Sequence, residues 1–582
     1  MVYQSRVVHI GELPLGGSAP IRLQSMTNTN TLDTRATVEQ AIRIANAGAD
    51  MVRITAPGLR EAQNLAEIKK ELQQRGVFVP LVADIHFNPA AAEIAARLVE
   101  KVRINPGNYT DRPVPGKVDY TDSENLFELE RIASRLKPLL RICSEYGTAI
   151  RIGVNHGSLS QRIVSRYGDT AEGMVQSAME FTRICHDSGF HNLVLSLKSS
   201  NVLVMTQACR LLAQRLADEH LYYPLHLGVT EAGDGEDGRL KSISGIGALL
   251  AQGIGDTIRV SLTEAPEAEL PVAQALVSRF QRISPDGRAE RYIRPDLRID
   301  ETAPLNRETI PSGPLGGKNP VAVLLKQGEI LLIADETGKT TPLPHRITGA
   351  DGAIADGERE IILFAGEPDM GQQLPELLKR LEQNPSMPLL AEAGTPALRR
   401  VAAALSEKGL KNPLILKSPV KAGTTDELLT EISLNPGNLL IDGAGNGICL
   451  EAPDIAPGLQ ASAGFGLLQA TRRRISKTEF IACPSCGRTL FNIQEALKAV
   501  KQRTGHLKGL KIGVMGCIVN GPGEMADADY GYVGAGNGKV NLYKGKEPVR
   551  KGVPESEAVE ALIVLIRENG DWKEAEEPDH KA

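Results

Sequence analysis

Eight short apolar segments, each followed by a longer segment with helical character, alternate between residue 21 and about residue 265. The strand-like segments begin at Ile21, Met51, Pro80, Lys101, Ala149, Asn192, Pro224 and Thr257. Helical segments are expected at 37–47, 89–98, 123–146, 171–188, 201–217 and 242–252. A strand–helix unit repeated eight times predicts a TIM (β/α)8 barrel. A doubly wound sheet is the main alternative, but no G-x-G-x-x-G sequence follows the first strand.

Polar side chains occupy alternate positions in several of these strands. Residues i and i+2 of a strand share a face, and the apolar neighbours between them would face the surrounding helices. The polar set would therefore point into the barrel, and its basic members are Arg53, Arg103, Arg151, Lys198 and Arg259. Few carboxylates share that face, chiefly Asp84 and Glu231. Because burying unpaired cations is costly, the pattern predicts a phosphorylated, polyanionic small ligand at the barrel mouth.

The 582-residue chain is long enough for two to four domains. We predict a substrate-binding barrel at 1–282, an inserted α/β structural domain at 283–463 and a C-terminal α/β domain at 464–582. The insert lacks the inward polar pattern and is expected to resemble a partial barrel. Its expected strands are the runs PVAVLL, GEILLIAD, REIILFAG, PLLAEAG, NPLILKS and NLLIDG, between residues 320 and 443.

Three cysteines lie close together in the C-terminal domain. Cys483 and Cys486 form a C-x-x-C pair, and Cys517 precedes an Asn-Gly-Pro-Gly turn that would bring Glu524 to the same centre. Three thiolates and a carboxylate suit an iron–sulfur cluster with one weakly held iron. Structural zinc prefers four Cys or His ligands, and His506 is a candidate fourth ligand. The spacing alone leaves both kinds of site open.

Composition and charge narrow the class of protein. A net charge of -5 argues against bulk nucleic-acid binding. No apolar run approaches the length of a membrane span, and the first residues have neither signal nor transit character. We therefore expect a cytoplasmic protein with no nucleic-acid or membrane partner.

Eight motifs in order along the chain give a specific resemblance. They are QSMTNT at Gln24, VADIHF at Val82, RINPGN at Arg103, RIGVNHGS at Arg151, LHLGVTEAG at Leu225, GIGDTIRVSL at Gly253, ACPSCGR at Ala482 and GCIVNGPGE at Gly516. With them the chain resembles the 4-hydroxy-3-methylbut-2-en-1-yl diphosphate synthase family. The segment 283–463 resembles the central insert of the family's three-domain form.

The resemblance implies an iron–sulfur oxidoreductase of the methylerythritol phosphate (MEP) pathway of isoprene biosynthesis. Such an enzyme reductively opens and dehydrates 2-C-methyl-D-erythritol 2,4-cyclodiphosphate to 4-hydroxy-3-methylbut-2-enyl diphosphate. The electrons would come one at a time from ferredoxin or flavodoxin. The short form of the family is a homodimer in which one subunit's cluster domain covers the other's barrel. With the insert present, closure within one chain is the second arrangement that stays open.

Site residues follow from the resemblance position by position. A [4Fe-4S] cluster would be held by Cys483, Cys486, Cys517 and Glu524, and the carboxylate of Glu524 would yield its iron to the substrate. The diphosphate would be bound by Arg53, Arg103, Arg151, Lys198, Arg259 and Ser261. His86, Asn155 and His226 would orient the substrate, and Glu231 would be the catalytic carboxylate that handles a proton. The alternative is a non-redox phosphate-binding TIM-barrel lyase or transferase with a structural zinc ribbon.

Overall fold

The structure is a computed structural model of the whole chain. It describes residues 3–85, 87–109, 119–283, 289–291, 305–328, 330–343, 345–349, 360–365, 370–487, 489, 491–518, 521–525, 527–536 and 538–574. The chain divides into two compact units. The first comprises residues 1–238, 249–299 and 477–582, and the second comprises 239–248 and 300–476.

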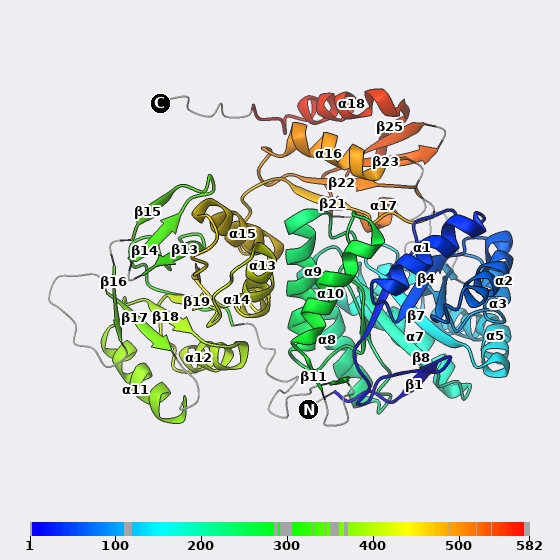
Figure 1. Cartoon of the computed structure of the whole chain (residues 1–582), viewed down its shortest axis with the longest axis horizontal. Coiled ribbons are helices and arrows are strands. Elements are labelled where there is room, and N and C mark those ends of the chain that lie inside the picture. Colours follow the sequence, from blue (N-terminus) through cyan, green and yellow to red (C-terminus); the bar gives the residue numbers. More distant parts are fainter. Residues whose placement is uncertain are drawn as a thin grey trace. The chain divides into compact units, whose positions relative to one another are not determined.

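The first unit contains the predicted barrel (Figure 1). Its parallel strands are β3 (Arg22–Met26), β4 (Met51–Thr55), β5 (Leu81–Asp84), β6 (Lys101–Ile104), β7 (Ala149–Asn155), β8 (Leu193–Lys198), β9 (His226–Leu227) and β10 (Thr257–Ile258). The hydrogen-bonded order is β8-β7-β6-β5-β4-β3-β10-β9, and a parallel bridge between Leu195 and Leu225 closes the ring. The expected α/β fold class with an N-terminal (β/α)8 barrel is thus confirmed, although β9 and β10 are only two residues long.

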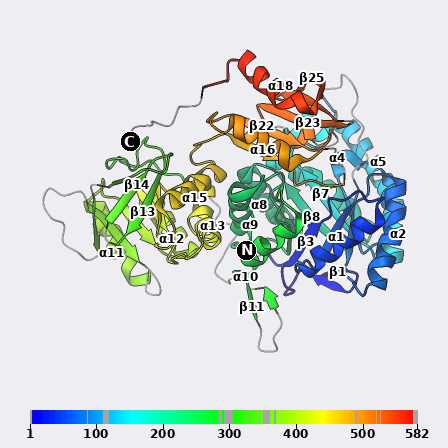
Figure 2. The same ribbon diagram turned by 45° about the horizontal axis from the view of Figure 1, so that its top comes forward.

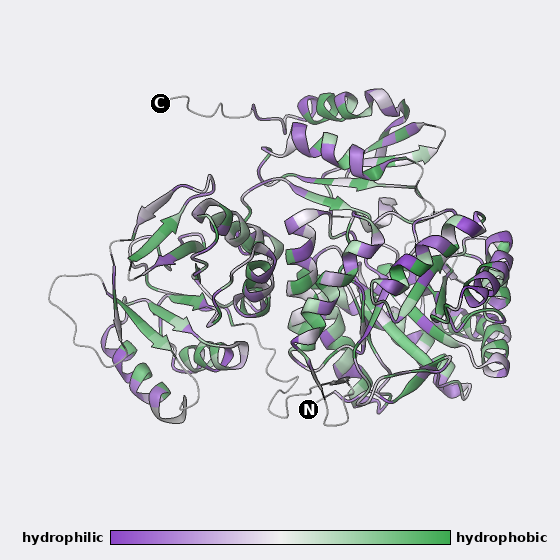
Figure 3. Cartoon of the chain, viewed as in Figure 1, coloured by the Kyte–Doolittle hydropathy of each residue, from purple (hydrophilic) through white to green (hydrophobic). Residues whose placement is uncertain are grey.

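Amphipathic helices surround these strands. They are α1 (Thr34–Asn46), α2 (Leu59–Gln74), α3 (Pro89–Ala95), α4 (Pro106–Tyr109), α5 (Asp122–Tyr146), α6 (Gln161–Tyr167), α7 (Ala171–Asp187), α8 (Val202–Asp218) and α10 (Glu269–Ser278). Helix α9 (Gly235–Leu250) begins in the first unit, and its residues 239–248 belong to the second. Figure 3 shows hydrophilic residues gathered on the outer helices, and the strands inside are largely hydrophobic. Helix α2 lies between β4 and β5, where the predicted strand–helix alternation requires a helix. A hairpin of β1 (Val8–Ile10) and β2 (Leu13–Leu15) packs in an apolar cluster with Met51, Val82 and Ala149, near the amino ends of the strands.

The second unit is built on an open eight-stranded sheet. Its strands, in spatial order, are β15 (Thr340–Pro342), β14 (Ile330–Ala334), β13 (Ala322–Gln327), β20 (Gly447–Leu450), β19 (Leu414–Lys417), β18 (Leu389–Glu392), β17 (Glu360–Ala365) and β16 (Arg346–Gly349). The pairs from β13 through β20 to β16 are parallel, and β14 and β15 are antiparallel additions. Its helices are α11 (Met370–Gln383), α12 (Thr395–Glu407), α13 (Thr425–Leu434), α14 (Pro436–Ile441) and α15 (Pro457–Ala470).

One strand expected in the insert is wrong. The run NLLIDG, from Asn438, lies mostly in helix α14, and the strand that follows is β20. Pro436 stands in the first turn of α14, where its fixed φ favours a helix and its missing N–H costs nothing. A short apolar run between turns cannot be assigned to strand or helix by periodicity alone.

The C-terminal sheet belongs to the first unit. Its order is β21 (Glu479–Ala482), β22 (Lys511–Met515), β23 (Tyr530–Gly536), β24 (Lys539–Lys544) and β25 (Glu547–Pro554), covered by α16 (Ile493–Thr504) and α18 (Glu555–Glu568). The short helix α17 (Gly521–Glu524) follows β22. The sheet contacts the barrel directly, because Ala482 bridges Ala232 and the Gln494 side-chain amide donates to the Thr263 carbonyl at 2.9 Å. Figures 1 and 2 show α17 and β21 beside one end of the barrel.

Among the described residues, no helix is long and apolar enough to cross a membrane. The predicted domain boundaries remain a prediction, and helix α15 spans the boundary expected at residues 463 and 464.

Candidate active site

A cavity with about 710 Å³ of empty space, part of it open to solvent, lies where the carboxyl ends of the barrel strands meet the C-terminal sheet. Its walls include eight of the predicted barrel residues, which are Arg53, Arg103, Arg151, Asn155, Lys198, Glu231, Arg259 and Ser261. The same walls include all three cysteines of the C-terminal domain, Cys483, Cys486 and Cys517. Residues more than 200 positions apart in sequence therefore share one space.

The cations of this cavity have carboxylate neighbours behind them. Asp84 at the end of β5 accepts from Arg103 at 3.3 Å and lies 3.8 Å from an Arg53 nitrogen. Arg103 also donates to the Gly153 carbonyl at 2.8 Å and to Asn155 at 3.3 Å. These contacts hold the guanidinium groups in place within the barrel wall.

Positive charge exceeds negative charge in the site. Four arginines and Lys198 face the cavity, whereas the nearby carboxylates are Glu231 in its wall and Asp84 and Glu269 behind it. The pKa of Arg151 is lowered mainly by burial and, to a smaller extent, by the nearby charges of Arg53 and Arg103. The pKa of Lys198 is likewise lowered mainly by burial, with a smaller effect from the charges of Arg53 and Arg151. An anionic ligand would relieve this repulsion, since each cation would gain a counter-charge.

Glu231 has an unusual backbone. It follows β9 with φ +47°, a left-handed conformation that non-glycine residues adopt rarely, and it is 3% exposed. Such strain persists where the surrounding structure over-determines it, and it is common at active sites. The conformation places Glu231 in the cavity wall beside the cations.

The C-x-x-C turn is tied together by hydrogen bonds. Ser485 in its middle has φ +64°, which lets the turn double back. The Cys486 N–H donates to the Thr489 hydroxyl at 3.0 Å, and the Gly516 N–H donates to the Cys483 sulfur at 3.3 Å. The last bond connects the C-x-x-C turn to the residue just before Cys517.

These donors are suited to an iron–sulfur cluster. Burial raises the pKa of Cys483, and the neighbouring Cys486 raises it further, whereas N–H bonds from Gly516 and Ser485 lower it. All three cysteines are free thiols. Among the described side chains, no three His, Cys, Asp or Glu groups are placed to hold a single ion. Three thiols in the wall of one cavity are the donors that such a cluster takes, and thiolates that bind different irons need not converge on one point.

Four predicted ligands or binding residues need separate mention. His86 lies outside the described residues, and of Glu524 the structure describes only the backbone, in α17. His226 is fully buried in β9, with Nδ1 3.4 Å from the Thr257 hydroxyl, and it is not part of the cavity wall. His506, the candidate fourth zinc ligand, instead lies against the ring of Trp572 and 2.8 Å from the Lys573 carbonyl.

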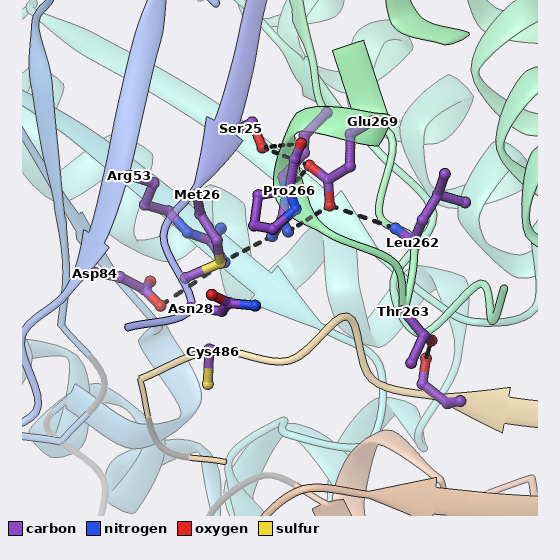
Figure 4. A network of polar contacts seen from close by, with 12 residues as sticks. Ser25, Met26, Asn28, Arg53, Asp84, Leu262, Thr263, Pro266, Glu269 and Cys486 are labelled. Atoms are coloured by element: carbon purple, nitrogen blue, oxygen red, sulfur yellow. Dashed lines mark hydrogen bonds and ion pairs between the residues drawn. The ribbon is translucent and has the colours of Figure 1, made fainter. Parts of the chain in front are cut away.

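Several residues of the site were not predicted as site residues. Ser196 in β8 and Thr230, three residues after β9, lie in the cavity wall but were assigned no role. Met26 also lies in the cavity wall, two residues after the inward Gln24, and its apolar side chain gave no signal of a polar contact. Glu269 lies in helix α10 and holds Arg259 from behind, a contact between non-adjacent elements that strand periodicity cannot indicate (Figure 4).

Comparisons with known proteins bear on the whole chain. Residues 5–274 match the model described as the GcpE TIM-barrel domain, and residues 479–568 match the GcpE protein C-terminal domain. A Parabacteroides distasonis protein named 4-hydroxy-3-methylbut-2-en-1-yl diphosphate synthase (flavodoxin) is 47% identical, and the alignment covers 98% of each chain. Proteins of the same name from Bacteroides fragilis and Chlorobaculum tepidum are 47% and 40% identical. Those alignments cover 97% and 98% of this chain, and 96% and 89% of the relatives.

Proposed function

The chain belongs to the GcpE family, and from this premise we propose that it is a 4-hydroxy-3-methylbut-2-en-1-yl diphosphate synthase. It is an oxidoreductase of the MEP pathway, as the motifs led us to expect. It reductively opens the ring of 2-C-methyl-D-erythritol 2,4-cyclodiphosphate and removes a hydroxyl as water, which yields 4-hydroxy-3-methylbut-2-enyl diphosphate.

One observation carries the proposal. The cationic barrel mouth and the three cysteines line the same cavity, so a bound polyanion would lie next to whatever the cysteines hold. A barrel that merely bound phosphate, with a zinc ribbon elsewhere, would have no need of this arrangement.

A [4Fe-4S] cluster at Cys483, Cys486, Cys517 and Glu524 would supply single electrons and a Lewis-acidic iron. The protein's contribution to that site is a set of thiolates held by backbone donors such as the Gly516 N–H. Glu524, on the short helix α17, is the proposed exchangeable ligand, since a carboxylate is a harder ligand than a thiolate.

The barrel residues would bind and orient the substrate. Arginine offers paired N–H donors that match phosphate oxygens, and Lys198 offers a point charge. The proposed diphosphate ligands are Arg53, Arg103, Arg151, Lys198, Arg259 and Ser261, and Asn155, His86 and His226 would orient the rest of the molecule. His226 lies outside the cavity wall, with Nδ1 3.4 Å from the Thr257 hydroxyl, so its part in orienting the substrate would be indirect. Glu231, in the wall, would hold the proton that leaves with the hydroxyl.

The electron donor and the assembly are part of the proposal. The names of the relatives specify flavodoxin, so we propose flavodoxin rather than ferredoxin as the donor. The cavity is complete within one chain, which supports closure of the cluster domain on its own barrel rather than on that of a homodimer partner. Size-exclusion chromatography of the active protein would separate these arrangements, and activity confined to the dimer would contradict closure within one chain.

The function is tested with anaerobically purified protein. We expect turnover of the cyclic diphosphate with reduced flavodoxin, together with roughly four iron and four acid-labile sulfide per chain. Colourless protein with stoichiometric zinc and no turnover would favour the non-redox alternative. Iron-loaded protein that consumes no cyclic diphosphate would refute the assigned reaction while leaving the cluster in place.

A further inference from the structure

Arg259 at the end of β10 has most of its donors committed to the protein. Its Nε donates to Glu269 at 3.1 Å, its Nη2 donates to the same carboxylate at 2.8 Å, and its Nη1 donates to the Met26 sulfur at 2.9 Å. A guanidinium has five N–H groups, one on Nε and two on each terminal nitrogen. Among the described residues, two N–H groups therefore remain without a protein acceptor, one on each terminal nitrogen. We call these two remaining N–H groups the free fork, because guanidinium N–H groups are the donors that bind phosphate oxygens.

Glu269 is itself fully engaged. Its Oε1 accepts from Arg259 and, at 3.4 Å, from the Leu262 N–H, and its Oε2 accepts from Arg259 and, at 2.7 Å, from the Ser25 hydroxyl. Both partners of the ion pair have side chains only 2% exposed. The carboxylate orientation that satisfies all four donors also fixes the plane of the Arg259 guanidinium, which meets both carboxylate oxygens.

Met26 connects this pair to the next cation. Its sulfur accepts from Arg259 on one side and from Arg53 Nη2, also at 2.9 Å, on the other. Figure 4 shows the Met26 sulfur near the end of Arg53, with Asp84 to one side of it and Glu269 to the other. A thioether is a neutral, weak acceptor, so it spaces the two guanidinium groups without cancelling their charge. A carboxylate at this point would reduce the excess of positive charge that an anionic ligand needs.

We propose that Glu269 is a positioning residue that turns the free fork of Arg259 toward a diphosphate group in the cavity, with Met26 setting the separation of Arg259 from Arg53. The inference rests on the proposed function for the identity of the diphosphate. Arg259 lines the cavity and Glu269 does not, so Glu269 would act on a ligand through Arg259. Its charge balances Arg259 from behind, and its geometry determines where the remaining N–H groups point.

Replacement of Glu269 by glutamine tests the positioning role. One carboxylate oxygen would become an amide NH2 group, which cannot accept a hydrogen bond from the Arg259, Leu262 or Ser25 donors. Inorganic diphosphate is the probe, and its dissociation constant is measured by calorimetry on the anaerobically purified full chain. We expect Glu269→Gln to weaken diphosphate binding at least about tenfold and to raise KM more than it lowers kcat, with iron content unchanged. The matched control is Glu267→Gln, two positions before Glu269 in the sequence. It removes a half-exposed ion pair with Arg43 and should leave the dissociation constant for diphosphate unchanged.

A double-mutant cycle separates positioning from general destabilisation. If Glu269 acts through Arg259, Glu269→Gln should change diphosphate affinity less than about twofold in an Arg259→Lys background. Full additivity of the two changes, or unchanged affinity in a folded Glu269→Gln protein, would overturn the proposal. If Glu269→Gln does not fold, the Ser25→Ala variant provides the test, because it removes one hydrogen-bond donor to Glu269. We expect the affinity for diphosphate to fall about threefold. An unchanged affinity would overturn the proposal.

These outcomes are independent of the proposed reaction. Diphosphate binding is measured without turnover, so a protein with no activity toward the cyclic diphosphate would refute the reaction and leave the positioning test intact.

Discussion

At the scale of single residues, the site combines buried cations with partly buried thiols. Arg151 and Arg259 are 1% and 2% exposed, and Cys483 lies beside them in the same cavity wall. Charges are kept inside a protein at such cost only where a counter-charge is present or arrives. Asp84 and Glu269 supply part of that counter-charge, and a diphosphate would supply the rest.

Replacing a cysteine ligand and replacing the glutamate ligand should have different effects on iron content and on turnover. We expect Cys517→Ala to lose the cluster, because a thiolate is a tightly held ligand, and its iron content should fall sharply. Glu524→Ala should keep the cluster's visible absorption but lose roughly two orders of magnitude in turnover or more. Iron analysis and a turnover assay on both variants check this. A Glu524→Ala protein with unimpaired turnover would remove Glu524 from the reaction.

Strand periodicity found most of these residues for a physical reason. Arg53, Arg103 and Arg151 occupy alternate positions in strands whose neighbours are apolar, and a strand turns alternate side chains to one face. Strand periodicity could not identify Glu269, because this residue belongs to helix α10 and not to a strand. Met26 escaped it because a methionine is expected to fill space, and its role as an acceptor depends on two arginines from other strands.

At the scale of elements, the loop after β7 meets helix α17. A Cβ placed on Gly523 would lie 2.5 Å from the Gly157 carbonyl oxygen and 3.2 Å from the carbonyl carbon. The two backbones therefore pack together closely enough to exclude any side chain. This contact joins the loop that follows Asn155 to the turn that carries Glu524.

A methyl group at this contact should impair the reaction without removing the cluster. We expect Gly523→Ala to lower kcat about 10- to 100-fold, since displacing a reacting group by a fraction of its radius is enough to misalign it. Iron content should stay unchanged. The control is Gly458→Ala in α15, where an added Cβ meets nothing within 4 Å and activity should be unaffected. Full activity of Gly523→Ala would show that the close contact plays no part.

The predicted elements succeeded where their length and boundaries were distinctive. All eight predicted barrel strands exist, because β-branched runs bounded by helical segments have few alternative structures. The strand assigned at NLLIDG failed because Pro436 and a tight turn favour helix α14. The reduction of β9 and β10 to two residues each depends on contacts around the ring that no single segment encodes.

The ends of strands β18 to β20 carry a buried charge network in the second unit. Lys417, 2% exposed, lies 2.5 Å from Glu392 and 2.9 Å from Glu451, and Lys421 lies 3.0 Å from Glu451. Burial acts to raise the pKa of Glu451, but hydrogen bonds from Lys417 and Lys421 outweigh it and lower that pKa to about 2. The network therefore stabilises the fold above the ordinary pKa of a glutamate, and this stabilisation is lost as pH falls toward 2.

Replacing Lys417 should reveal how much the charge network contributes to the stability of the second unit. We expect Lys417→Met to lower the free energy of unfolding of the second unit by about 2 kcal/mol at pH 7. The difference from the unmodified protein should shrink between about pH 5 and about pH 3, as Glu451 begins to be protonated. Calorimetric unfolding at several pH values measures both, with Lys408→Met, which breaks an exposed pair with Glu382, as the neutral control. A difference that does not depend on pH would contradict the role given to Glu451.

At the scale of the whole molecule, two parts of the chain separated by the insert contribute to one cavity. The barrel supplies the cationic wall and the C-terminal sheet supplies the cysteines, with contacts such as Ala232 to Ala482 between them. Motifs at both ends of the chain predicted the two halves of the site. Their union within one chain could not be derived from sequence, because the same motifs are compatible with closure across a homodimer.

Electron paramagnetic resonance of the anaerobically reduced protein tests this union most directly. The spectrum is recorded before and after addition of the cyclic diphosphate. We predict an iron–sulfur signal whose g values change when the substrate binds, because the barrel cations would hold the substrate against the cluster's ligands in one cavity. A reduced protein with no iron–sulfur signal, or a signal that saturating substrate leaves unchanged, would contradict the account.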